Sequence, residues 1–168
     1  MRDTKGAFPL AVGAFVALTW LGMLIGVSFI ATPVKFEVSS LSLPVALEVG
    51  RVTFSLFAKI EWSAAALLVI ALVPAKTGTA LKTMVIATVA ILAVEALWLL
   101  PVLDARVSAV IAGQPLPPSL SHLLYALSEV AKALLLSGIA ALALRKFWLA
   151  NDTPVMKRDA HEVSEELA

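Results

Sequence analysis

Long runs of apolar residues constrain this chain more than any other feature of its sequence. From Ala7 to Ile30 no side chain is charged, and a helix of ~20 apolar residues is enough to cross the hydrocarbon core of a bilayer. Of the 168 residues, 60% are hydrophobic and only 15% are charged, whereas soluble domains are about half apolar and a quarter charged. The sequence therefore predicts an all-α integral membrane protein.

The first apolar run also has to be tested as a cleaved signal peptide. The run is far longer than the usual hydrophobic region of ~7–15 residues. Cleavage after Ala31 would place the bulky Phe29 where a small residue is required. We therefore expect a retained transmembrane helix. Gly22 and Gly26 offer a flat strip for close helix packing, but two glycines four residues apart are also common in apolar runs that have no packing role, and the second interpretation is preferred.

Prolines and glycines divide the rest of the chain into three further spans. Ser42 followed by Pro44 is typical of a helix start, and Pro74 and Gly113 are typical stops. The expected helices cover about residues 7–30, 44–73, 80–100 (with an extension to 112 left open) and 119–145. Residues 1–150 are thus predicted to form one antiparallel four-helix transmembrane bundle, and residues 151–168 a polar, disordered tail.

Basic residues in the connections predict the orientation of this bundle. The two termini and the second loop hold most of them, namely Arg2, Lys5, Lys76, Lys82, Arg145, Lys146, Lys157 and Arg158. The first and third loops hold only Lys35 and Arg106. Because loops rich in Lys and Arg stay in the cytoplasm, both termini are predicted to be cytoplasmic.

Several classes of function are disfavoured by the composition. A net charge of +1 argues against nucleic acid as a partner, and the absence of Cys excludes disulfides and thiolate sites. No nucleophile elbow, phosphate loop, zinc motif or di-iron motif is present, so no catalytic residue, metal or cofactor is predicted. His122 alone cannot give a monomer two axial haem ligands, and the lysines near it oppose a bound metal ion.

Charged residues deep in the expected spans are the most informative feature for function. Measured from the cytoplasmic helix ends at 1.5 Å per residue, they all lie ~20–24 Å up. They are Lys59, Glu61, Glu95, Glu129 and Lys132. By the same measure Arg51, His122 and Asp104 form an outer layer ~34–36 Å up. Since a charge at the bilayer centre costs at least ~3 kcal/mol, these residues need partners or water.

The helical period suggests which of these charges face one another. Glu48, Arg51 and Lys59 share one face of the second helix, and on the fourth helix Glu129 and Lys132 do the same. We expect the pairs Lys59 with Glu129 and Lys132 with Glu95, in a polar seam that opens outward between the second, third and fourth helices. Glu61 falls roughly opposite Lys59, so it is expected to face the first helix or a neighbouring protomer.

Two hypotheses from different classes follow. Buried ionisable residues are candidates for function, so the seam is predicted to bind or translocate a proton, an ion or a small polar ligand. The alternative is a structural or accessory subunit, in which the ion pairs only fix helix register and the first helix docks a second copy or a larger complex. The candidate site residues are Glu48, Arg51, Lys59, Glu95, Asp104, His122, Tyr125, Glu129 and Lys132.

Two segments resemble a known family. Gly50-Arg51-Val52-Thr53-Phe54, and His122-Leu123-Leu124-Tyr125 followed by Glu129 and Lys132, are similar to segments of the bacterial membrane proteins that resemble transmembrane protein 205. That family carries Arg-His-Thr-Phe in the first segment, and Val52 replaces its histidine. The resemblance implies a four-helix layout and a bacterial inner membrane. The eukaryotic relative is associated with platinum-drug resistance, which makes export or trafficking an expectation here.

Overall fold

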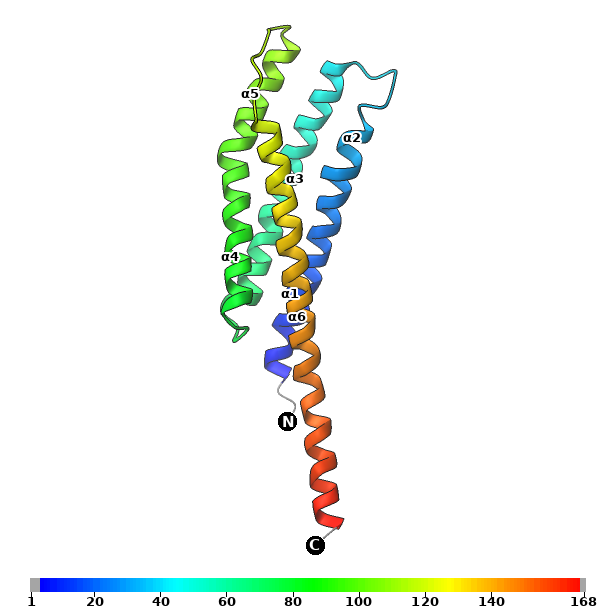
Figure 1. Ribbon diagram of the computed structural model, residues 1–168, viewed down its shortest axis with the longest axis vertical. Coiled ribbons are helices and arrows are strands. Elements are labelled where there is room, and N and C mark those ends of the chain that lie inside the picture. The colour runs from blue at the N-terminus through cyan, green and yellow to red at the C-terminus, as the bar shows by residue number, and fades with distance from the viewer. Residues whose placement is uncertain (1–3, 167–168) are drawn as a thin grey trace.

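The computed structural model describes the backbone of residues 4–166 and the side chains of residues 7–151. Figure 1 shows long helices lying side by side, and the described residues contain no strand. The elements are α1 Thr4–Leu24, the π-helical η1 Ile25–Ala31, α2 Thr32–Val34, α3 Leu43–Leu72, α4 Thr79–Val94, the π-helical η2 Glu95–Leu99, α5 Leu100–Ile111 and α6 Ser121–Glu166.

Four stretches of the described helices are long and apolar enough to cross a membrane. They are Ala7–Val34, Leu43–Leu72, Thr79–Ile111 and Ser121–Asn151. The first joins α1, η1 and α2, and the third joins α4, η2 and α5. Both chain ends lie at the same end of the bundle, so successive spans run in opposite directions (Figure 1). The main contacts join α1 to α3 and α6, and α4 to the same two helices.

Each π-helical segment is followed by a proline. Pro33 and Pro101 lack the N–H group that would bond to the carbonyl four residues back. The Thr32 N–H donates instead to the Val27 carbonyl, and the Leu100 N–H donates to the Glu95 carbonyl, one residue beyond the α-helical partner. The π segments therefore carry both spans past their prolines without ending them.

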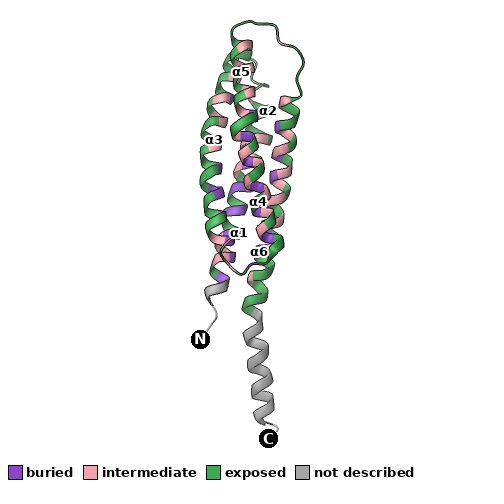
Figure 2. Ribbon diagram, turned by 90° about the vertical axis from the view of Figure 1, so that its left-hand side faces the viewer, coloured by how far each residue is buried: buried purple, intermediate pink, exposed green. Residues whose placement is uncertain are grey.

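Apolar side chains pack the half of the bundle nearest the chain ends. Leu72, Leu81, Val85 and Ile139 have no exposed surface, and Figure 2 shows buried residues on the inner faces of the helices. Large apolar side chains also point outward all around the bundle, among them Phe8, Phe15, Leu18, Ile70, Ile86, Leu97 and Leu134. An apolar exterior of this extent is suited to lipid rather than to water.

The helix bounds differ from the expected ones in two places. The first span continues to Val34 because η1 accommodates the proline. The backbone of α6 continues to Glu166, through the segment predicted to be a disordered tail. The third span takes the extension that was left open and ends before Gly113, whose φ is +70°.

The strip of Gly22 and Gly26 makes no close packing contact within the described chain. A Cβ atom on Gly22 or Gly26 would meet nothing within 4 Å, so this strip faces open space within the described chain. Gly13 makes the close approach instead, since a Cβ atom there would lie 2.5 Å from the side chain of Leu72 on α3.

Candidate functional site

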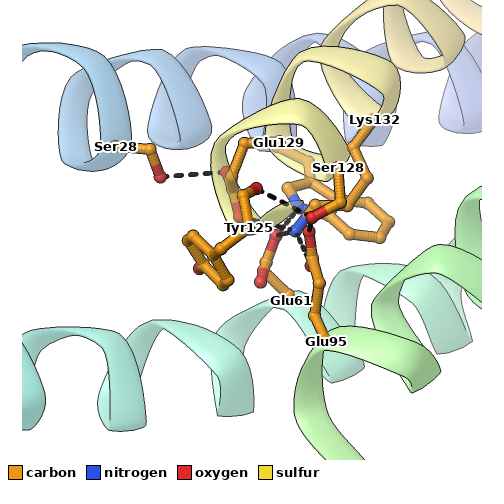
Figure 3. Close-up of polar contacts among 8 residues, drawn as sticks. Ser28, Glu61, Glu95, Tyr125, Ser128, Glu129 and Lys132 are labelled. Carbon is orange, nitrogen blue, oxygen red and sulfur yellow. Dashed lines mark hydrogen bonds and ion pairs between the residues drawn. The ribbon is translucent and has the colours of Figure 1, made fainter. Parts of the chain in front are cut away.

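Three carboxylates surround one ammonium group in the middle of the bundle (Figure 3). Nζ of Lys132 lies 2.6 Å from Oε1 of Glu61, 2.5 Å from Oε2 of Glu95 and 2.9 Å from Oε1 of Glu129. None of the four side chains is more than 3% exposed. We call these four residues the charge cluster, and they join α3, η2 and α6.

Neutral side chains complete the surroundings of the three carboxylates. Nε1 of Trp20 donates a hydrogen bond of 3.0 Å to Oε1 of Glu61. Oγ of Ser28 donates one of 2.9 Å to Oε2 of Glu129, and Oγ of Ser128 donates one of 2.6 Å to Oε1 of Glu95. Each carboxylate therefore has one neutral donor besides the ammonium group, and all four spans contribute to the site.

The charge cluster contains more acid than base. If all four groups are ionised, three negative charges face one positive charge, and no other basic side chain of the described residues pairs with these carboxylates. Oε2 of Glu95 and Oε1 of Glu129 are buried, and among the described residues each is paired with the ammonium group of Lys132. The three carboxylates also lie close enough for one oxygen of each to fall within 4.8 Å of the others.

The local sequence explains why these side chains turn inward. Glu61 lies on the same face of α3 as Phe57, Ala65, Leu68 and Leu72, all within ~40° of it at 100° per residue. This stripe is the buried face of the helix, so Glu61 is carried into the core with it. Glu95 is the first residue of η2, and Ser28 lies within η1. Both π segments therefore contribute a polar side chain at the charge cluster.

An open cavity of about 970 Å³ lies beside the charge cluster, in the half of the bundle away from the chain ends. Its lining comes from α2 and the turn that follows it, the first half of α3, η2, α5 and the start of α6. Tyr125 belongs to this lining and precedes Glu129 by one turn of α6, and its ring meets that of Phe54 edge-on at 5.4 Å. The Tyr125 ring therefore lies between the cavity and the charge cluster.

Charged residues lie along the part of the cavity that is farther from the chain ends. Arg51 pairs with Asp104 at 3.6 Å and with Glu48 at 3.5 Å, and donates a hydrogen bond of 3.2 Å to Ser108. His122 lines the same cavity. Lys35 lines it too, and partial burial lowers the pKa of its ammonium group below the usual 10.5.

Several predicted relationships are confirmed by this geometry. Lys132 pairs with Glu95, as expected, and Glu129 joins them at the same level. Arg51 and Asp104, which were predicted to lie at one level, are also in contact, although this pair was not itself predicted.

The predicted pair of Lys59 with Glu129 is wrong. Lys59 is exposed, lines the cavity and forms no ion pair within the described chain. Glu61, which was expected to lie outside the seam, takes its place in the charge cluster. Its hydrogen bond with Trp20 does confirm that it faces the first helix.

Sequence reasoning missed the three neutral donors. A single Trp or Ser in an apolar helix shows no pattern that separates a core residue from a site residue. One usable signal was available for Glu61, namely its position in the apolar stripe of α3. A polar residue inside such a stripe is buried with its neighbours unless the helix turns.

No family model matches this chain, and neither does any curated protein or solved structure with which it was compared. The resemblance to the relatives of transmembrane protein 205 therefore stays a prediction, and the site has to be interpreted from its own geometry.

Proposed function

We propose that this chain is a membrane protein whose charge cluster binds a proton or a small cation, reached from the cavity, and takes part in moving a solute across the bilayer. The excess of acid over base in the cluster is the observation that carries the proposal. An uncompensated buried charge costs several kcal/mol. A cluster with three carboxylates and one ammonium group is therefore stabilised by taking up one or two further positive charges.

Access to the cluster differs on its two sides. The cavity reaches Tyr125, one helical turn away, whereas Leu72, Leu81, Val85 and Ile139 close the other half of the bundle. With both termini in the cytoplasm, as the basic residues predict, the cavity faces outward. This arrangement supports a site that exchanges its proton or ion with the outer side.

A structural role is the second candidate, and one observation favours it. All four spans meet at the charge cluster, so the same contacts would fix the register of the whole bundle. Buried polar groups act in this way in coiled coils, at a cost in stability. In this role the cluster needs no exchange with solution.

Trp20 provides a reporter that separates the two candidates. Trp62, Trp98 and Trp148 are 41%, 56% and 62% exposed and lie outside the cluster, so all three can be replaced by Phe to leave Trp20 as the only tryptophan. Because Trp20 donates to Glu61, its emission should change when a proton or cation binds there. We expect a response to pH or to added Na⁺, measured in a neutral detergent.

Two variants complete the experiment. Glu61→Gln keeps an oxygen that can accept from Trp20 but removes the charge, and it should abolish the response. Glu48→Gln, which changes an exposed carboxylate near the cavity mouth, should leave the response intact. Infrared spectra of the carboxyl groups provide a second readout for protons. If neither signal changes between pH 5 and 9 or with Na⁺ while the protein stays folded, the structural role is the correct one.

A further inference from the structure

The wall of the cavity is mostly apolar, yet the charges along it do not balance. Its lining includes three basic side chains, Lys35, Arg51 and Lys59, but only one carboxylate, that of Asp104. Arg51 already pairs with that carboxylate. Lys35 and Lys59 form no ion pair within the described chain, although the ammonium group of Lys35 lies 5.0 Å from the centre of the Phe36 ring. The cavity thus carries two positive charges without a carboxylate partner.

The backbone makes room for one of these charges. A Cβ atom on Gly50 would collide with Nζ of Lys35, so the missing side chain lets the ammonium group lie against α3. Partial burial makes the charged form of Lys35 less favourable, as its lowered pKa shows. An anion beside Nζ would offset this cost. The ammonium group that lies partly buried against Gly50, without a carboxylate partner in the described chain, therefore favours a negatively charged group at the cavity mouth.

The cavity is open along the side of α3 as well as at its mouth. Val52 and Leu56 line it and are 64% and 59% exposed. If the span Leu43–Leu72 crosses the membrane, Leu56 lies ~27 Å from its cytoplasmic end and within the ~30 Å hydrocarbon core, whereas Val52 lies near the level of Arg51. The deeper part of this opening is therefore at the depth of the acyl chains. A volume of about 970 Å³ is at the upper end of the range for ligand pockets and is far larger than an inorganic ion needs.

We infer that the cavity binds a single-chain anionic amphiphile. Its carboxylate or phosphate head lies at the mouth beside Lys35, and Lys59 adds positive potential deeper along α3. The hydrocarbon chain follows the apolar wall made by residues such as Phe54, Leu100 and Val107 toward Tyr125. The amphiphile is thus the class of ligand inferred for the cavity. Its binding does not depend on the proposed function, but any coupling of that binding to a proton or cation in the charge cluster does.

Photo-crosslinking of the full chain in phosphatidylcholine vesicles tests this inference. Three probes share one hydrocarbon chain with a diazirine and differ only in their head groups, which are a carboxylate, a phosphate and a trimethylammonium. We expect either anionic probe to label peptides that line the cavity, and the stronger of the two identifies the head group. Equal labelling by the trimethylammonium probe, or labelling confined to other parts of the chain, would overturn the inference.

Paired lysine variants provide the matched control. Lys35→Gln with Lys59→Gln should reduce anionic labelling by about tenfold, which corresponds to ~1.4 kcal/mol of lost electrostatic attraction. Lys76→Gln with Lys82→Gln, at the opposite end of the bundle and outside the cavity, should leave it unchanged. Unchanged labelling in the first pair would contradict the inference.

The Trp20 signal, read in vesicles of the same composition, separates this inference from the proposed function. If the anionic probes fail while Trp20 still responds to pH or Na⁺, the ligand inference is wrong and the ion site stands. If labelling succeeds while Trp20 is silent, the ligand inference stands and the proposed ion site is wrong.

Discussion

Nε1 of Trp20 and Oε1 of Glu61 are joined by a buried hydrogen bond of 3.0 Å between the first and second spans. The same oxygen lies 2.6 Å from Nζ of Lys132. Trp20 therefore links the first span to the charge cluster without adding a charge. This makes the indole both a structural contact and a sensor of the carboxylate, and it leads to the first prediction.

Trp20→Phe should destabilise the bundle by about 1–3 kcal/mol, because Glu61 loses a buried donor and the smaller ring leaves space. Trp98→Phe, at a 56% exposed position, should change stability by no more than about 0.5 kcal/mol. Unfolding in mixtures of SDS and a neutral detergent measures both. Equal effects of the two substitutions would mean that the hydrogen bond contributes little.

Lys132→Met should be far more damaging, at about 3–5 kcal/mol, because it leaves three buried carboxylates without their ammonium group. The lost stability of this variant should be partly restored as the pH falls, because protons on the carboxylates can then replace the missing positive charge. The wild-type protein should show a weaker dependence over the same range. Thermal unfolding followed by circular dichroism between pH 5 and 8 checks this, with Lys82→Met as the control. A pH-independent loss would contradict the electrostatic explanation.

Gly13→Ala and Gly22→Ala form a matched pair on α1. At Gly13 the new Cβ atom meets the buried side chain of Leu72, and overpacking of this kind costs about 1–3 kcal/mol. At Gly22 it meets nothing, so the higher helix propensity of Ala should leave stability equal or slightly raised. Unfolding in SDS mixtures measures the difference. A loss of stability in Gly22→Ala would instead indicate that this strip packs against another copy of the chain. A change in oligomeric state would reveal such packing.

As the pH is raised, binding of an anionic amphiphile should begin to weaken at a lower pH than it would beside a lysine of ordinary pKa. The pKa of Lys35 is lowered from 10.5, and only its protonated form, present below that pKa, attracts an anion. Labelling should therefore decline as the pH rises through the lowered pKa. Lys35→Arg, which stays charged, should keep its labelling over the same pH range. Parallel curves for the two proteins would exclude Lys35 as the contact.

The spans and the level of the charges follow from the sequence because both depend on distances along single helices. Apolar runs, prolines and glycines mark the ends of the spans. A constant rise per residue places Glu95, Glu129 and Lys132 at one level before any packing is known. These three residues do meet in the structure.

The direction in which each helix faces could not be obtained in the same way. Lys59 and Glu61 lie at nearly equal depth, and the choice between them depends on how α3 is rotated against its neighbours. The polar face that contains Arg51 and Lys59 lines a cavity, whereas the stripe of Phe57 and Leu68 enters the core. A long lysine side chain can remain exposed where a glutamate would need partners. Only the packing of the whole bundle distinguishes these cases.

The π-helical segment η2 lies between α4 and α5 and sets the rotation of α5 relative to α4. A π turn holds one residue more than an α turn. If η2 adopted α-helical hydrogen bonding, α5 would rotate by roughly 100°, the angle of one residue, relative to α4. Asp104 would leave Arg51, while Glu95, at the start of η2, would keep its place beside Lys132. The extra residue of η2 therefore sets which face of α5 lines the cavity, while Glu95 at its start stays beside Lys132.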